Sequence, residues 1–179
     1  MAKIYPPIPN ENSDEYELEV RNYLSKLPDT WQILHRQRVI SGKREKEIDF
    51  ILINPQKGWI CLEVKGGAIS RDESGWIQSE KRIDDPIDKM QQARSLMYDL
   101  LEKKGHPITK FWGWNLVFPS IGSTNINLGS DLPKEKIIFA DQLPYMEEIF
   151  DSQLNAFGKS PALNQDSLNT FLNIIAPRI

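Results

Sequence analysis

The segment from residue 47 to residue 67 constrains the fold of this chain more than any other stretch, because it predicts two β-strands joined by a short turn. The runs 48–53 and 59–65 are both apolar and rich in β-branched or aromatic residues. Between them, residues 54–58 read Asn-Pro-Gln-Lys-Gly, which is typical of a turn. The segment therefore predicts a β-hairpin in the core of the protein.

The register of this hairpin follows from the alternation of side chains along a strand. Counting outward from the turn of a simple hairpin gives three opposed pairs on one face: Ile53 with Trp59, Ile51 with Cys61, and Asp49 with Glu63. Opposed side chains have Cβ atoms roughly 5 Å apart, and like charges in that position destabilise a sheet unless something neutralises them. Carboxylate oxygens are hard ligands of the kind that Mg²⁺ takes. The register therefore predicts a cation at this pair, and a slip of one residue would remove the site.

Lys65 lies two residues beyond Glu63 on the same face, and a Glu-x-Lys pair can also be an ordinary solvated strand face. Asp49 argues against that alternative. It stands between Ile48 and Phe50 in a run that is predicted to be buried on both faces, where Asp is rarely found without a partner. Taken together, Asp49, Glu63 and Lys65 indicate a functional site.

The sequence Ile-Asp-Phe at 48–50, followed by Leu-Glu-Val-Lys-Gly at 62–66, resembles the core of the PD-(D/E)XK nuclease superfamily and, within it, the nuclease-related domain (NERD) family. The likeness runs from the helix near Tyr16 to the strand ending near Phe118. Its specificity comes from an ordered set: a helix with Glu, a strand with Asp, a strand with Glu-x-Lys and a helix with Gln. Ile48 stands where the superfamily name has Pro, a departure that the nuclease-related family tolerates. The resemblance implies an α/β fold with a central mixed β-sheet flanked by helices, a restriction-endonuclease-like core.

A helix is predicted from about residue 13 to residue 26, capped by Asn12 or Ser13. Glu17 and Glu19 lie at similar angles on either side of its apolar stripe, so helical geometry does not choose between them. The family pattern Glu-x-x-Val-x-x-x-Leu matches Glu17, and the resemblance implies that Glu17 points toward the metal site. A surface position for Glu17 is the alternative.

A second helix is predicted at 86–103, with Asp85 as its cap and Pro86 at its first position. The resemblance places the family's site glutamine at Gln92. Gln91 is the alternative, because this chain has additional residues before the glutamine compared with the usual pattern.

The resemblance implies that one or two Mg²⁺ or Mn²⁺ ions are held by Asp49, Glu63 and Glu17, with the backbone carbonyl of Val64 as a further ligand. Lys65 would orient a metal-bound water or stabilise charge on the scissile phosphate, with Gln92 nearby. The implied reaction is hydrolysis of DNA phosphodiester bonds, with RNA as the other substrate to consider. The sequence contains no paired-His zinc motif, no Walker loop and no Ser-His-Asp set that would indicate other chemistry.

The net charge of −3 argues against a generally basic surface, so contacts with DNA must come from a local patch. Five basic residues on and around the predicted turn 41–46 are the best patch: Arg36, Arg38, Lys43, Arg44 and Lys46. A solvated hairpin tip is the alternative. A lone His such as His35 in the preceding strand is more often structural than catalytic.

The length of 179 residues predicts one domain with three parts: an extended lead-in at 1–12, the nuclease-related core at 13–140 and a C-terminal helical extension at 141–179. The other predicted elements are strands at 31–39, 111–118 and 136–140, a short β excursion over 68–79, a loop at 119–133, and helices at 143–157 and 166–175. The single cysteine, Cys61, excludes an internal disulfide and is expected to be a buried hydrophobe.

No run of residues approaches transmembrane length, so a cytoplasmic protein is expected. The resemblance also allows the chain to be the amino-terminal module of a larger repair or defence protein. A second function from another class is a catalytically weak nucleic-acid-binding or interaction module serving a helicase partner. A third is a purely structural α/β domain. The sequence leaves the oligomeric state open.

Overall fold

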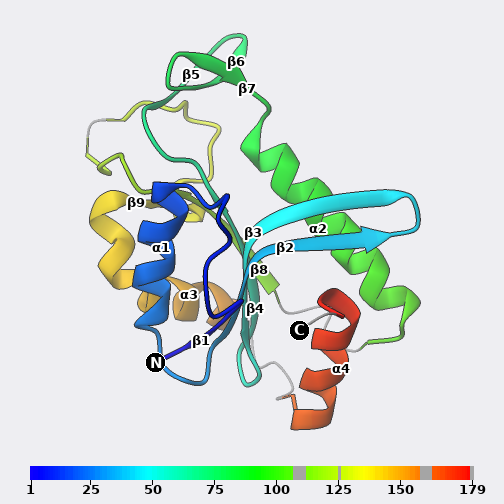
Figure 1. The fold of residues 1–179 in the computed structure, drawn as a ribbon. Helices are drawn as coiled ribbons and strands as arrows, with labels where there is room; N and C mark the ends of the chain where they lie inside the picture. The colour runs from blue at the N-terminus through cyan, green and yellow to red at the C-terminus, as the bar shows by residue number, and fades with distance from the viewer. Residues whose placement is uncertain (107–111, 125, 158–162, 178–179) are drawn as a thin grey trace.

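The computed structural model describes residues 1–106, 112–124, 126–157 and 163–177. Its main element is a six-stranded mixed sheet with the strand order β1-β2-β3-β4-β8-β9 (Figure 1). The strands are β1 (Lys3–Tyr5), β2 (Gln32–Ser41), β3 (Arg44–Asn54), β4 (Gly58–Val64), β8 (Trp112–Phe118) and β9 (Ile137–Phe139). The pairs β2–β3 and β3–β4 are antiparallel, and the other three pairs are parallel. The predicted central mixed sheet is confirmed.

Helices cover both faces of this sheet (Figure 1). One face carries α1 (Glu15–Ser25) and α3 (Met146–Asn155), and the other carries α2 (Pro86–Lys103) and α4 (Gln165–Ile175). The strand residues alternate accordingly: Phe50 and Leu62 pack in the core on the α1 side, whereas Ile51 and Cys61 pack in the core on the α2 side. Every residue of β4 is buried, which explains why its sequence is apolar without alternation.

The register of the β3–β4 hairpin agrees with the prediction, since Ile53 pairs with Trp59 and Ile51 pairs with Cys61. The ladder ends at the pair Phe50–Leu62. Asp49 and Glu63 are the next residues outward on their strands, so the two carboxylates meet where this pairing stops. Cys61 is fully buried, as expected, and its Sγ lies 3.9 Å from the Sδ atom of Met97.

A second, three-stranded sheet links β4 to α2 and consists of β5 (Ile69–Asp72), β6 (Gly75–Gln78) and β7 (Lys81–Ile83). The predicted β excursion is right for β5 and β6, but the prediction missed β7. Its three residues carry no alternating pattern, and they pair with β6 through a tight turn in which Ser79 and Glu80 have positive φ. The start of α2 agrees with the prediction, because the side chain of Asp85 caps it.

Two local predictions near the site are wrong. The N-cap of α1 is Asp14 rather than Asn12 or Ser13, since Asp14 Oδ1 accepts a hydrogen bond of 2.8 Å from the backbone N–H of Glu17. The stretch 41–46 is not an extended exposed turn, because Ser41 already pairs with Arg44 and only residues 42 and 43 turn. Gly42 allows this with a φ of 62°, so β2 and β3 form a long hairpin arm that lies along α2 (Figure 1).

The remaining differences concern the ends of the chain. The expected lead-in contains β1, which pairs in parallel with β2 at the edge of the sheet. The helix predicted at 143–157 begins as a 3₁₀ helix, η3 (Ala140–Tyr145), and continues as α3, and another short 3₁₀ helix, η2 (Lys134–Lys136), precedes β9. Phe111, predicted to begin the strand 111–118, lies outside the described residues. Among the helices that the structure describes, none is long and apolar enough to cross a membrane.

Candidate metal centre and its surroundings

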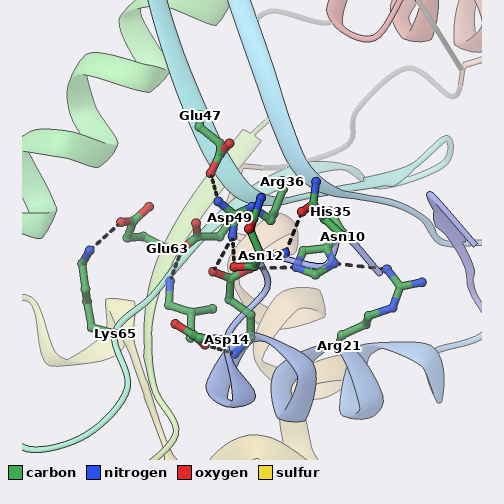
Figure 2. A network of polar contacts seen from close by, with 12 residues as sticks. Asn10, Asn12, Asp14, Arg21, His35, Arg36, Glu47, Asp49, Glu63 and Lys65 are labelled. Atoms are coloured by element: carbon green, nitrogen blue, oxygen red, sulfur yellow. Dashed lines mark hydrogen bonds and ion pairs between the residues drawn. The ribbon is translucent and has the colours of Figure 1, made fainter. Parts of the chain in front are cut away.

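Asp49 and Glu63 form a buried pair of carboxylates, which we call the carboxylate pair. Asp49 lies in the middle of β3 and Glu63 near the end of β4, just beyond the last β3–β4 pair. Asp49 is 8% exposed and Glu63 is 2% exposed. The backbone N–H of Val64 donates a hydrogen bond of 2.8 Å to Asp49 Oδ2, which fixes that carboxyl group across the end of the hairpin. In Figure 2, Asp49 lies between Glu63 on one side and Arg36 and His35 on the other.

The environment of Asp49 disfavours its charge. Burial first, and then repulsion by Glu63, raise the pKa of Asp49 from its ordinary value of 3.8 to about 8, although the Val64 N–H and Lys89 act in the opposite direction. No cation lies within ion-pair distance of Asp49 among the residues that the structure describes. Asp49 is therefore a buried carboxyl group whose ionised form has no ion-pair partner among the described residues.

Glu63 differs from Asp49, because two ammonium groups contact one of its oxygens. Lys89 Nζ lies 2.6 Å from Glu63 Oε1, and Lys65 Nζ lies 3.0 Å from the same atom. Lys65 follows directly after β4, whereas Lys89 comes from the first turns of α2. Burial, the largest single cause, lowers the pKa of Lys89, but the combined attraction of Glu63, Asp49 and Glu47 makes the net shift upward.

Sequence reasoning predicted Lys65 and missed Lys89. A lysine in a helix has no local signature, and only the packing of α2 against the sheet brings Lys89 to the carboxylate pair. One signal was available: Lys89 lies one helical turn before Gln92, so a helix that carries site residues places both on neighbouring positions of one face.

Glu17 faces this region from α1, whereas the alternative, Glu19, is exposed. Glu17 Oε2 lies 3.0 Å from Nε2 of His35, whose Nδ1 lies 3.2 Å from Nη1 of Arg21. A guanidinium can only donate, so Nδ1 accepts, and Nε2 must carry the proton that is donated to Glu17. His35 is therefore the neutral Nε2–H form, and it stacks on Phe50 with 4.4 Å between ring centroids.

Arg36 approaches the same carboxylate from the other side, with Nη1 3.5 Å from Glu17 Oε1 and Nη2 2.9 Å from Glu47 Oε1. Its backbone has a φ of 52°, and the β2–β3 ladder omits the pair Arg36–Asp49 between two regular pairs. A non-glycine residue in this region is strained, and such strain often marks functional sites. We call Glu17, Arg21, His35 and Arg36 the histidine network.

The other four basic residues of the predicted patch lie along the β2–β3 arm. Arg38 forms an ion pair with Glu45, and Arg44 Nη2 lies 2.6 Å from Asp99 Oδ2 on α2. Lys46 Nζ donates a hydrogen bond of 2.8 Å to Gln92 Oε1. Lys43 is exposed at the turn of the arm. Most of the predicted phosphate contacts therefore already face an acid or an amide.

Gln92 lies away from the carboxylate pair in this arrangement, since its recorded partner is Lys46. Gln91, the alternative, accepts a hydrogen bond of 3.4 Å from Arg94 Nη1. The structure thus brings Asp49, Glu63 and Lys65 together and places Glu17 at their edge. It does not bring either glutamine to the carboxylates, and the expected role of Gln92 stays a prediction.

A cavity of about 550 Å³ opens where the chain leaves β4 and β8, and its described lining does not include Asp49, Glu63 or Lys65. Tyr16, Gly67, Ile69, Ser120 and Thr124 are among its lining residues, and none of the described lining residues is charged. Its wall is tightly packed, because a Cβ atom on Gly66 would lie only 2.0 Å from the ring of Tyr16. The cavity therefore offers a neutral surface two residues beyond Lys65.

A divalent metal fits the carboxylate pair when waters complete its coordination. Among the described residues, no group of three or more His, Cys, Asp and Glu side chains is placed to hold a metal ion. Mg²⁺ is usually bound by one or two carboxylates and keeps several waters. Two adjacent buried carboxylates, one of them without an ion pair, suit such an ion and not a site made of protein ligands alone.

Comparison with known proteins agrees with this site. Residues 13–118 match the family model of the nuclease-related domain, and these residues include Glu17, Asp49, Glu63, Lys65 and Lys89. No curated protein and no solved structure matches the chain.

Proposed function

The chain belongs to the nuclease-related domain family, and from this premise we propose that it is a metal-dependent nuclease that hydrolyses phosphodiester bonds of DNA. The observation that supports the proposal is the carboxylate pair: Asp49 and Glu63 lie buried and adjacent, and Lys65 contacts Glu63. Asp49 forms no ion pair with any described residue, so a bound cation would supply the counter-charge that its ionised form lacks.

In this proposal Asp49 and Glu63 hold Mg²⁺ or Mn²⁺, with the Val64 carbonyl and Glu17 as the further ligands expected from the family. Such an ion, when bound, lowers the pKa of a coordinated water so that hydroxide is available near neutral pH. The N–H of Val64 keeps Asp49 oriented, and the burial of both carboxylates keeps bulk water from competing for them. His35 holds one oxygen of Glu17 in place, which leaves the second oxygen near Arg36.

Lys65 supplies positive charge for the substrate. Its ammonium group stabilises the charge that grows on the scissile phosphate as water adds, and that stabilisation is strong where the site is shielded from solvent. The neutral cavity beside Lys65 accommodates a sugar or a base of the bound strand. Its volume of about 550 Å³ suits one nucleotide and not a duplex.

Nucleic-acid binding in this proposal is local and weak. The net charge is −3, and the basic residues of the β2–β3 arm are largely paired with acids, so few cations are free to neutralise phosphates. Lys43 at the exposed turn of the arm is the first of the patch to meet a phosphate backbone, and the other four would have to exchange their partners.

The same pairing favours the second candidate function, a catalytically weak nucleic-acid-binding or interaction module that serves a helicase partner. Both candidates keep the fold and the family, and they differ in whether the carboxylate pair turns over substrate.

Cleavage assays separate the two candidates. Supercoiled, linear and single-stranded DNA, and a matched RNA, would be incubated with the full chain in Mg²⁺ and in Mn²⁺, beside Glu63→Gln and Lys65→Met. The nuclease proposal expects cleavage that EDTA stops and both variants lose. No cleavage of any substrate by the folded parent would contradict it, and binding of DNA without cleavage would support the second candidate.

A further inference from the structure

Glu63 contacts two ammonium groups, although one would be enough to neutralise its carboxylate. Lys65 Nζ and Lys89 Nζ lie 3.0 Å and 2.6 Å from the same atom, Glu63 Oε1, and the Glu63 side chain is only 3% exposed. One ammonium group neutralises one carboxylate. A second one on the same oxygen adds repulsion between the two cations, so a simple structural ion pair does not explain both.

The second charge is explained by Asp49, which has no ion pair of its own among the described residues. Metal binding requires both carboxyl groups in their ionised form, in which Asp49 and Glu63 carry two negative charges that the two ammonium groups of Lys65 and Lys89 match. The two ammonium groups thus supply the same total charge as one divalent cation. They contact Glu63, one of the two proposed metal ligands.

We infer that Lys89 is a second active-site lysine, which together with Lys65 takes the place of the divalent cation on Glu63 in the metal-free protein and contacts the substrate phosphate once a metal is bound. This inference rests on the proposed function, because it assumes that a metal binds the carboxylate pair. It adds a phosphate contact from α2, where the family pattern leads one to expect a glutamine.

The side chain of Lys89 is suited to move. It is 40% exposed, whereas that of Lys65 is 19% exposed, and it projects from the first turns of α2 on a flexible stem of four methylene groups. When a metal takes Glu63, Lys89 can leave without disturbing the core. A phosphate group replaces Glu63 as the counter-ion of the two ammonium groups, so no covalent bond is made or broken in the exchange.

A titration with Mn²⁺ tests this exchange without relying on activity. Binding to the full chain would be followed by the loss of the free Mn²⁺ signal in electron paramagnetic resonance, for the parent, Lys89→Met and Lys103→Met. Lys103 is an exposed lysine roughly 20 Å further along α2, so its variant loses the same charge far from the site. We expect Lys89→Met to bind Mn²⁺ about threefold to tenfold more tightly than the parent, with Lys103→Met unchanged.

A second measurement tests the phosphate contact. At saturating Mn²⁺ we expect Lys89→Met to cleave DNA on the order of 10 to 100 times more slowly than the parent, and Lys89→Arg to recover part of that loss because it keeps the charge. Tighter metal binding combined with slower cleavage is the signature, since damage to the fold would weaken both.

The outcomes are distinguishable from failure of the proposed function. If Lys89→Met binds Mn²⁺ no more tightly than the parent, Lys89 does not compete with the metal and the inference is overturned. If the parent binds Mn²⁺ but cleaves nothing, the nuclease proposal fails. The displacement of Lys89 is then decided by the titration alone: tighter binding by Lys89→Met supports it, and equal binding overturns it. A parent that binds no Mn²⁺ overturns both.

Discussion

The carboxylate pair and the histidine network are two neighbouring polar clusters, and Asp49 of the first stands opposite Arg36 of the second across β2 and β3 (Figure 2). They balance their charges differently. In the histidine network the groups satisfy one another: Glu17 has His35 and Arg36, and Arg21 donates to His35 and to the carbonyls of Pro6 and Pro7. Asp49 in the carboxylate pair has only one N–H donor and no ion pair among the described residues. Buried polar groups that serve only the fold normally have all their hydrogen-bond and ion-pair partners within the protein. The carboxylate pair lacks such an ion-pair partner at Asp49, so it is the position where a bound ion would supply one.

Glu63→Gln should give the largest effect, because it removes a charged group that the proposed metal and both lysines share. We expect cleavage to fall on the order of 10³-fold while the fold is retained, since the amide keeps the shape of the side chain. The measurement is the single-turnover cleavage rate in Mg²⁺, with circular dichroism to verify folding. Glu19→Gln is the control, because Glu19 is an exposed acid in α1. Equal rates for Glu63→Gln and the parent would end the case for a catalytic carboxylate pair.

The unsaturated charge of Asp49 should also appear as a dependence of stability on pH in the metal-free protein. The pKa of Asp49 is raised from 3.8 to about 8, first by burial and then by Glu63. Between about pH 4 and about pH 8 the folded protein therefore holds a proton that the unfolded chain releases. Stability in EDTA should be highest below this window and fall as pH rises through it, by up to about 1.4 kcal/mol per pH unit.

Urea unfolding of the parent and Asp49→Asn at pH 5, 6.5 and 8 in EDTA measures this slope. Asp49→Asn should flatten the curve, whereas Asp99→Asn, which changes the partly exposed partner of Arg44, should leave it as in the parent. Added Mg²⁺ should stabilise the parent more at pH 8 than at pH 5, because the ion binds the ionised carboxyl group. If the stability of the parent in EDTA does not fall as pH rises, Asp49 is already ionised in the metal-free protein and the expected proton is not held.

Arg21→Met tests the other cluster and should affect stability rather than metal binding. Arg21 is 9% exposed, and its loss leaves His35 Nδ1 and the carbonyls of Pro6 and Pro7 without their donor. We expect a loss of about 1–3 kcal/mol of unfolding free energy, with unchanged Mn²⁺ affinity. Arg82→Met removes an arginine from an exposed ion pair with Asp72 and should leave the stability nearly unchanged, because solvent screens that pair. A changed Mn²⁺ affinity in Arg21→Met would show that the histidine network contributes to metal binding at the carboxylate pair.

Gln92→Ala should have the smallest effect, because the recorded partner of Gln92 is Lys46 and not a carboxylate. We expect the cleavage rate to change by less than about threefold, which is within the effect of losing one exposed hydrogen bond. Gln91→Ala is the matched comparison on the same helix. A loss greater than about tenfold in Gln92→Ala alone would restore Gln92 to the site, and would mean that α2 turns when substrate binds.

The sequence predicted the features that depend on local pattern. The strands of the hairpin, the pairs Ile53–Trp59 and Ile51–Cys61, and the capping of α2 by Asp85 follow from alternation and turn chemistry that reside in a few neighbouring residues. The features that the sequence did not predict depend on tertiary contact. The three-residue strands β1 and β7 are defined only by their partners, and Lys89 reaches Glu63 only because α2 packs against the sheet.

The choice between Glu17 and Glu19 shows the same limit. Both lie at similar angles to the apolar stripe of α1, and the rotation of the packed helix decides which of them is buried. Family likeness favoured Glu17 where periodicity did not, and the structure buries it beside His35. The ion pair between Arg36 and Glu17 has no local signal either, since it needs the left-handed backbone of Arg36.

The β2–β3 ladder lacks the pair Arg36–Asp49, and this interruption makes it possible to detect ion binding at the site by hydrogen exchange. On both sides of it, β2 and β3 are regularly paired, His35 with Phe50 and Gln37 with Ile48. In native-state hydrogen exchange, amide protons at the interrupted rung should be replaced by deuterium sooner than those of its neighbours, because local opening there breaks fewer hydrogen bonds. The gap lets a solution experiment observe one position inside an otherwise protected sheet, and slower exchange at that position on addition of Mg²⁺ would record ion binding without any substrate.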